Sequence, residues 1–270
     1  MTTFVSSAST LVDPIADGAR IAVPPDYSGV AMAATRALVA RGVRGLRLVA
    51  VPQAGLQVDV LIGAGCVASI ETAGINLGEY GLAPRYTDAV QRGELRVIDG
   101  TCPALHAGLQ AAEKGIPFMP LRGILGSDLL RVRPDWRVID NPYGTDDPIV
   151  LIPAIRPDFA LFHSGMADRE GNVWIGVRRE LMTMAHAAAR SLVTVETIVD
   201  TNLLEDPALA AGTIPSLYVD RIAEAPGGMR PLPFTGGSVP VAGDEALLAR
   251  YARAATTREG FDEFMKDWLA

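Results

Sequence analysis

The sequence has few of the features that mark secreted, membrane or nucleic-acid-binding proteins. Two of its 270 residues are cysteines, which is too few for a disulfide framework, and they lack C-x-x-C metal spacing. Aromatic residues make up 6% and the formal net charge is −7, whereas a nucleic-acid groove needs clustered Lys/Arg and aromatics. No apolar run approaches the ~20 residues of a membrane-spanning helix, and the N-terminus lacks a basic signal-peptide region. We therefore expect a soluble, cytoplasmic protein with no metal site and no nucleic-acid or membrane partner.

The composition instead describes an ordinary globular chain. Hydrophobic residues make up 49% and charged residues 20%, with 27 glycines and 19 prolines. This excludes intrinsic disorder and collagen-like repeats. At roughly 150 residues per domain, the length allows one large domain or two modest ones. We favour one domain over residues 1–270, with an N-terminal arm at 1–14 and C-terminal helices at 243–270.

Apolar runs rich in β-forming residues alternate with helical stretches along the chain, which is typical of βαβ units. The expected fold is therefore α/β, with a mostly parallel sheet and helices on both faces. Strands are expected at 19–23, 46–51, 58–62, 67–70, 95–98, 118–121, 149–152, 159–162 and 192–195. Helices are expected at 30–41, 86–92, 104–114, 179–189, 244–255 and 259–268. The Pro- and Asp-rich stretch 132–148 is expected to be a loop, either a linker or an excursion from one domain.

Motifs of catalysis or cofactor binding are weak. The Gly-Ala-Gly sequence at 63–65 lacks the third glycine of a dinucleotide-binding loop, and a strand is expected to follow it, so we interpret it as a tight turn. His106, His163 and His186 stand singly in the sequence. We expect each of these histidines to have a structural role.

Two polar segments directly follow expected strands. Asp168, with Asn172 four residues later, suits a sharp turn held by hydrogen bonds from the backbone to side chains. Gly126, Ser127 and Asp128 follow the strand expected at 118–121. Polar groups at the carboxyl end of a strand can face a ligand, so this loop is either part of a binding site or a structural turn.

Seven stretches, in this order and spacing, resemble the A (alpha) subunit of family I CoA-transferases, in the branch of glutaconate CoA-transferase. They are LIGAGCV (61–67), GEYGLAP (78–84), GLQAA with GIPF (108–118), LGSD (125–128), PAIRPD (153–158), ADREGN (167–172) and APGG (225–228). Each stretch is common by itself, but seven in the right order are a specific signal. The resemblance covers roughly residues 15–260.

The resemblance implies a CoA-transferase-like open α/β fold and a chemistry. Such enzymes move CoA between carboxylic acids through acyl-anhydride and glutamyl-CoA thioester intermediates, with the nucleophilic glutamate on a separate B subunit. This chain would then supply part of the acyl pocket and pair with a B-type subunit. It would hold no permanent cofactor, because a coenzyme A thioester and a carboxylic acid are the substrates. Two alternatives stay open: a subunit of a ring-opening CoA-thioester hydrolase, and a non-catalytic binding or scaffold subunit.

Two positions depart from the family pattern. Relatives usually have a Gly-Gly-Phe-type loop after the first strand, where backbone N–H groups can approach an oxyanion. Here Pro24 and Pro25 remove two such donors, although Ser28 or Gly29 could still donate. Relatives also tend to carry Glu or Gln thirteen residues before the glycine of Gly-Ile-Pro, where this chain has Cys102.

Cys102 is therefore a candidate catalytic residue. A thiol near a helix N-terminus can act as a nucleophile or base, and the alternative is a small buried thiol in the core. Glu79 is a second candidate catalytic residue. Because ligands bind at the carboxyl ends of parallel strands, we expect Cys102 and residues 74–79 to line one pocket with two further segments. These two segments are 27–29 and 126–128, so the candidate pocket residues besides Cys102 and Glu79 are Tyr27, Ser28, Gly29, Gly74, Gly126, Ser127 and Asp128.

Overall fold

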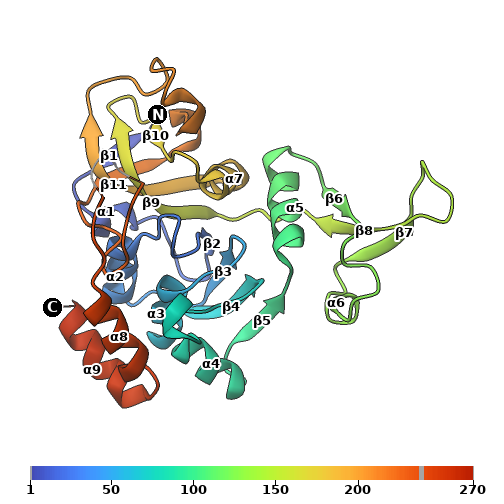
Figure 1. The fold of residues 1–270 in the computed structure, drawn as a ribbon, viewed down its shortest axis with the longest axis horizontal. Coiled ribbons are helices and arrows are strands. Elements are labelled where there is room, and N and C mark those ends of the chain that lie inside the picture. Colours follow the sequence, from blue (N-terminus) through green and yellow to red (C-terminus); the bar gives the residue numbers. More distant parts are fainter. Residues whose placement is uncertain (1, 237–239, 270) are drawn as a thin grey trace.

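The computed structural model describes residues 2–236 and 240–269. These residues form a ten-stranded sheet and a separate three-stranded sheet (Figure 1). The main path of the large sheet is parallel throughout. Its order is β1 (Thr3–Val5), β13 (Arg221–Glu224), β11 (Arg190–Val199), β9 (Phe159–Asp168), β2 (Arg20–Val23), β3 (Leu46–Ala50), β4 (Val67–Thr72) and β5 (Arg96–Asp99). Two short strands, β10 (Val173–Trp174) and β12 (Thr213–Ile214), extend it antiparallel from β9.

Helices cover both faces of the large sheet, as the alternation of elements predicts. One apolar core lies between one face and the helices α1 (Ala8–Leu11), α2 (Met32–Arg41), α3 (Leu56–Gly63), α4 (Pro84–Gln91), α8 (Glu245–Ala254) and α9 (Arg258–Leu269). A second core lies against the other face, where α5 (Cys102–Glu113) and α7 (Arg179–Ala187) pack together. Strand β9 lies between the two cores and is buried along nearly its whole length, as expected of a central parallel strand.

The three-stranded sheet forms a lobe beyond α5, away from the large sheet (Figure 1). It consists of β6 (Phe118–Leu121), β8 (Pro148–Pro153) and β7 (Arg137–Asp140), all antiparallel, with the short helix α6 (Leu129–Val132) between β6 and β7. One face packs Val150 and Ile152 against Trp136 and the alanines of α5. The lobe therefore has a small core of its own, built on α5.

Two sequence predictions are wrong. Residues 58–62 belong to the helix α3 and not to a strand. Gln57 and Asp59 alternate with apolar residues in the sequence as in a strand, but every residue of α3 is buried, and a short buried helix has no polar face to reveal its period. The loop expected at 132–148 contains the strand β7, whose four residues are all exposed. The other expected strands and helices are present within two residues of their predicted bounds, except that β9 and β11 extend well beyond the predicted 159–162 and 192–195.

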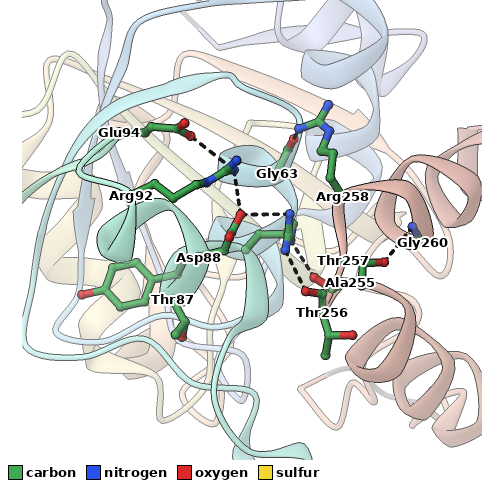
Figure 2. A network of polar contacts seen from close by, with 12 residues as sticks. Gly63, Thr87, Asp88, Arg92, Glu94, Ala255, Thr256, Thr257, Arg258 and Gly260 are labelled. Atoms are coloured by element: carbon green, nitrogen blue, oxygen red, sulfur yellow. Dashed lines mark hydrogen bonds and ion pairs between the residues drawn. The ribbon is translucent and has the colours of Figure 1, made fainter.

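The two ends of the chain are held by different elements. In the N-terminal arm, β1 pairs with β13 and Leu11 enters the core. At the C-terminus, Arg258 donates a hydrogen bond to the carbonyl of Gly63 (2.7 Å) at the end of α3 (Figure 2). The buried Arg85 of α4 donates to the carbonyl of Ala255 (2.6 Å) between α8 and α9. These bonds hold the C-terminal helices against α3 and α4. Among the described residues, no helix has the length and apolarity needed to cross a membrane.

Candidate functional site

A pocket of about 410 Å³ lies where the loops after β2, β3 and β4 meet the C-terminal segment. Pro25, Asp26 and Tyr27 come from the loop after β2, and residues 76–80 come from the loop after β4. The carboxyl ends of three parallel strands thus converge here, as open α/β sheets generally arrange their ligand sites. Four leucines are among the lining residues: Leu56, Leu77, Leu232 and Leu248.

Asp26, in the pocket lining, has a buried carboxylate oxygen that makes no hydrogen bond. Its Oδ2 accepts a hydrogen bond from the backbone N–H of Leu56 (2.9 Å), at the start of α3. Its Oδ1 is shielded from solvent and has no hydrogen-bond partner in the structure. Burial raises the pKa of Asp26 to about 7, with a smaller contribution from the negative charge of Asp59, while the Leu56 hydrogen bond opposes the shift.

Charged groups gather at the rim of the pocket. The guanidinium of Arg178 lies over the ring of Tyr27, 5.3 Å from its centroid, which is a favourable cation–π geometry. Glu79 and Glu245 line the same pocket and are exposed. The pocket therefore combines an apolar interior with one cation and two carboxylates at its edge.

A second polar cluster involves Ser28, which follows Tyr27 in the sequence. The buried hydroxyl of Ser28 donates a hydrogen bond to the carboxylate of Glu180 in the first turn of α7. Burial lowers the pKa of His106 on α5, and the charge of Glu180 partly offsets this shift. Ser28, Glu180 and His106 thus bring the loop after β2, α7 and α5 together beside the pocket.

The backbone of this loop is fixed by close contacts. The N–H of Ser28 donates to the carbonyl of Pro25 (2.9 Å), so this expected donor is already engaged within the loop. Gly29 has a φ of +142°, and a Cβ built there would lie 2.2 Å from the carbonyl oxygen of His163. Only glycine fits such a position. Gly29 therefore lets the loop lie directly on β9.

Cys102 is exposed and is the first residue of α5. The alternative of a buried Cys102 is therefore wrong; the buried thiol is Cys66, and burial raises its pKa. His106 lies one helical turn after Cys102, and residues four apart share one face of a helix. Cys102 does not line the pocket described above, so it lies on the same helix as the His106 cluster but outside the cavity.

The remaining candidates are divided between the pocket and the lobe. Gly78 and Glu79 line the pocket, and Gly74 accepts a backbone hydrogen bond from Ala54 (3.2 Å), which also lines it. Residues 126–128 lie in the lobe, between β6 and α6, and are not part of the lining. Asp128 pairs there with Arg131 (3.1 Å), and its side chain is 91% exposed. The structure thus brings the loops after β2 and β4 together, without Gly126, Ser127 or Asp128.

Asp168 and His163, two further positions from the sequence analysis, make hydrogen bonds that stabilise the fold. Asp168 accepts hydrogen bonds from the backbone N–H groups of Glu170 and Asn172, as expected of the sharp turn. The buried ring of His163 contacts Thr194 (2.9 Å) and Glu196 (2.8 Å). Burial acts to raise the pKa of Glu196, but its hydrogen bonds with His163 and Gly227 hold that pKa below its usual value.

Sequence reasoning missed Asp26, Arg178 and Glu180. Arg178 and Glu180 lie more than 150 residues from the Tyr27–Ser28 loop that they contact, so no local pattern connects them. Asp26 follows two prolines at the end of a strand, and this local signal of a fixed polar group could have revealed it. In residues 2–236 and 240–269, no group of three His, Cys, Asp or Glu side chains is placed to hold a metal ion.

Three relatives that are named as enzyme subunits align over most of this chain. The chain is 34% identical to the A subunit of 3-oxoadipate CoA-transferase of Pseudomonas knackmussii, over 80% of this chain and 76% of that protein. It is 31% identical to the A subunit of glutaconate CoA-transferase of Acidaminococcus fermentans, over 80% and 72%. It is 30% identical to the cholesterol ring-cleaving hydrolase IpdA subunit of Rhodococcus jostii, over 88% and 82%. The chain spans about half the length (51%) of an uncharacterised relative from Archaeoglobus fulgidus, to which it is 33% identical.

Two solved structures superpose on this chain over nearly its whole length. A variant of the decarboxylase AibA/AibB has a chain that superposes with a TM-score of 0.86 at 31% identity, covering 100% of this chain and 99% of that one. Glutaconate coenzyme A-transferase from Acidaminococcus fermentans gives a TM-score of 0.89 at 25% identity, covering 99% and 89%. The family model for coenzyme A transferase matches residues 5–225. This chain therefore belongs to the coenzyme A transferase family, with the fold of the A-type subunits that the sequence motifs predicted.

Proposed function

We propose that this chain is the A-type component of a two-component acyl-CoA enzyme that transfers CoA between carboxylic acids. The observation that carries the proposal is the pocket at the carboxyl ends of β2, β3 and β4, with its four leucines and charged rim. An acyl chain would fill the apolar interior, since ligand pockets of this kind bury apolar groups and orient them with a few polar contacts. The relatives that are named as A subunits support a B-type partner subunit.

In this proposal the chain shapes the acyl site while the B subunit carries the nucleophilic glutamate. Tyr27 and Glu79 would contact the substrate from the pocket lining, and Ser28 would be positioned by Glu180. Exposed Cys102 would face the partner or the CoA moiety, and Gly74 would contribute at the edge of the site, whereas residues 126–128 lie in the lobe and have no place in this pocket. The CoA thioester is then a substrate with no resident cofactor, and the enzyme would work in the cytoplasm.

A CoA-thioester hydrolase is the second candidate. The specific observation in its favour is the hydrolase-named relative, which aligns over 88% of this chain, whereas the two transferase subunits each align over 80%. In either reaction the loop after β2 would not stabilise an oxyanion as a glycine-rich loop does, because Pro24 and Pro25 lack a backbone N–H and the Ser28 N–H donates to the carbonyl of Pro25.

The test is turnover by the chain alone and together with a candidate B-type subunit from the same organism. Acetyl-CoA and hexanoyl-CoA serve as donors and glutarate as acceptor, and chromatography separates the CoA products. Transfer by the complex, with negligible transfer by either chain, is expected, because loss of an essential nucleophile costs several orders of magnitude in rate. Release of free CoA independent of glutarate would favour the hydrolase. Robust transfer by the single chain would overturn the two-component proposal.

A further inference from the structure

The carboxyl group of Asp26, in the pocket lining, lacks the partners that would stabilise a negative charge. The Oδ1 atom of Asp26 is shielded from water and unpartnered, while Oδ2 is bonded to the Leu56 N–H. An unpaired, shielded charge is costly, and a group in that position gains by taking up a proton. The pKa of Asp26, raised to about 7 by burial, agrees with this geometry.

The carboxyl group of Asp26 is closely packed by the backbone of a neighbouring loop. A Cβ built at Gly55 would lie 2.2 Å from Asp26 Oδ2 and 2.6 Å from the carbonyl oxygen of Asn76, so the backbone of the β3–α3 loop packs directly on the carboxyl. Pro24 and Pro25, immediately before Asp26, have fixed φ angles. These contacts hold the carboxyl of Asp26 beside the pocket.

The groups that face this carboxyl and the pocket determine what an added charge would do. Glu79 from the loop after β4 and Glu245 from α8 line the pocket, and Arg178 is the cation among its lining residues. Behind Asp26, the carboxyl of Asp59 on α3 accepts a hydrogen bond from the hydroxyl of Tyr251 on α8 (2.6 Å). With Asp26 neutral, the charged groups of the lining are the cation of Arg178 and the two rim carboxylates. With Asp26 ionised, the wall of the pocket gains a further negative charge close to any ligand.

We infer that Asp26 is a specificity-determining residue whose neutral form lets the pocket hold an anionic carboxylate ligand and whose ionised form excludes that ligand. The inference rests on the proposed function, since it assigns the pocket to the carboxylic acid or acyl substrate. Asp26 acts through charge and not by bonding the ligand, because its Oδ1 is shielded from solvent. The affinity for an uncharged ligand of the same shape should not depend on the ionisation of Asp26.

The test uses the full-length chain and two probes, hexanoate and its uncharged analogue hexanamide, with binding measured by titration calorimetry from pH 6 to pH 8. Because the neutral fraction of an acid falls about tenfold per pH unit above its pKa, and that of Asp26 is about 7, hexanoate should bind about tenfold more weakly at pH 8 than at pH 6. Hexanamide should bind with the same affinity at both. Equal hexanoate affinity at both values, or no hexanoate binding at any pH, would overturn the inference.

Two variants test whether Asp26 causes the pH dependence of hexanoate binding. Asp26→Asn keeps the shape and an oxygen for the Leu56 N–H, and its hexanoate affinity should be independent of pH. Glu245→Gln removes a rim carboxylate from the same pocket and should retain the tenfold pH effect. A pH effect that persists in Asp26→Asn contradicts the inference. If Asp26→Asn does not fold, the comparison of hexanoate with hexanamide on the unaltered chain still decides.

The outcome is separable from that of the proposed function. CoA transfer by the two-chain complex is measured independently of hexanoate binding. Transfer that persists while hexanoate binding shows no pH effect removes only the role of Asp26. Absence of both transfer and hexanoate binding removes the proposed function together with the inference that rests on it.

Discussion

The guanidinium of Arg133 donates a hydrogen bond to the Glu71 carboxylate (2.8 Å), and the pair joins the three-stranded lobe to the large sheet. Both residues are about 5% exposed. Glu71 lies in β4, and Arg133 directly follows α6 in the lobe. Arg133 also donates to the carbonyl of Asp99 (2.8 Å) at the end of β5 and lies over the ring of Trp136. One buried side chain thus connects the lobe core to the edge of the large sheet.

Replacing Arg133 should destabilise the protein. Arg133→Met removes the buried ion pair with Glu71 but leaves Glu71 its pair with Arg20, so the loss should be measurable but below the about 3–5 kcal/mol typical when a buried charge is left without a partner. Urea denaturation followed by circular dichroism measures the loss. The matched control is Arg131→Met, two residues earlier, whose ion pair with Asp128 is almost fully exposed and should contribute nothing measurable. Equal stability of both variants would show that the buried pair does not hold the lobe.

Much of the fold could be predicted because it depends on local patterns. Parallel strands such as β3 are short apolar runs, and α2 ends where Gly42 adopts the left-handed conformation, which is a local signal. The helix α3 was missed because its buried polar residues, Gln57 and Asp59, find partners in Thr35 and Tyr251, far from them in the sequence. Strand β7 was missed because its exposed residues show no alternation of apolar and polar faces.

The candidate site was predictable only in part, for the same reason. The rule that loops converge at the carboxyl ends of parallel strands indicated Tyr27 and Glu79, which do line one pocket. It could not place Asp128, because that residue follows a strand of the separate antiparallel sheet. Nor could it reveal Glu180, whose contact with Ser28 arises only when α7 packs against the loop after β2. The expectation of a single domain over residues 1–270 stays a prediction.

The two cysteines should react very differently with alkylating reagents. Cys102 is exposed, whereas Cys66 is buried and burial raises its pKa, so the thiolate needed for reaction is scarcer at Cys66. Iodoacetamide on the native chain should modify Cys102 alone, as read by mass spectrometry of tryptic peptides. Cys102→Ala should then remain unlabelled until it is unfolded. Labelling of Cys66 at a similar rate in the native state would contradict the placement of both thiols.

The same labelling tests whether Cys102 borders the substrate. If the acyl-CoA lies between the pocket and α5, hexanoyl-CoA should slow the alkylation of Cys102, and free hexanoate should not, because the acid alone fits inside the pocket. Turnover by Cys102→Ala in complex with its partner subunit provides a separate measure of any catalytic role. Undiminished alkylation at saturating hexanoyl-CoA would place Cys102 outside the substrate site.

Removing the charge of Glu180 should lower the pKa of His106. Burial already lowers that pKa, and the negative charge of Glu180 opposes the shift by favouring the charged imidazolium. Glu180→Gln leaves burial unopposed, so the imidazole should titrate at lower pH than in the unaltered chain, as followed by nuclear magnetic resonance of its ring nitrogens. Glu113→Gln, further along α5 and next to His186 (3.5 Å), should leave His106 unchanged. An unaltered His106 titration in Glu180→Gln would mean that α5 and α7 do not share this polar cluster.

Asp59 should make the protein less stable as the pH rises from about 4 to 6. Its side chain is fully buried, and burial raises its pKa from 3.8 to about 6, although the hydrogen bonds from Tyr251 and from the backbone N–H of Tyr86 oppose the shift. In the unfolded chain the carboxyl ionises near pH 4, whereas in the folded chain it retains its proton until about pH 6. The unfolded state therefore gains free energy from ionisation first, and a shift of about two units corresponds to about 3 kcal/mol.

Asp59→Asn removes that titration while preserving the size of the side chain. Its free energy of unfolding, measured by urea denaturation at several pH values, should fall less steeply between pH 4 and pH 6 than that of the unaltered chain. A residual slope continuing toward pH 7 is expected from Asp26, whose pKa is raised to about 7. Asp262→Asn, which changes an exposed carboxylate of α9 paired with Arg258, is the matched control and should keep the full slope. If Asp59→Asn also keeps the full slope, Asp59 is ionised in the folded protein over this pH range. The hydrogen bonds from Tyr251 and Tyr86 then lower its pKa by more than burial raises it.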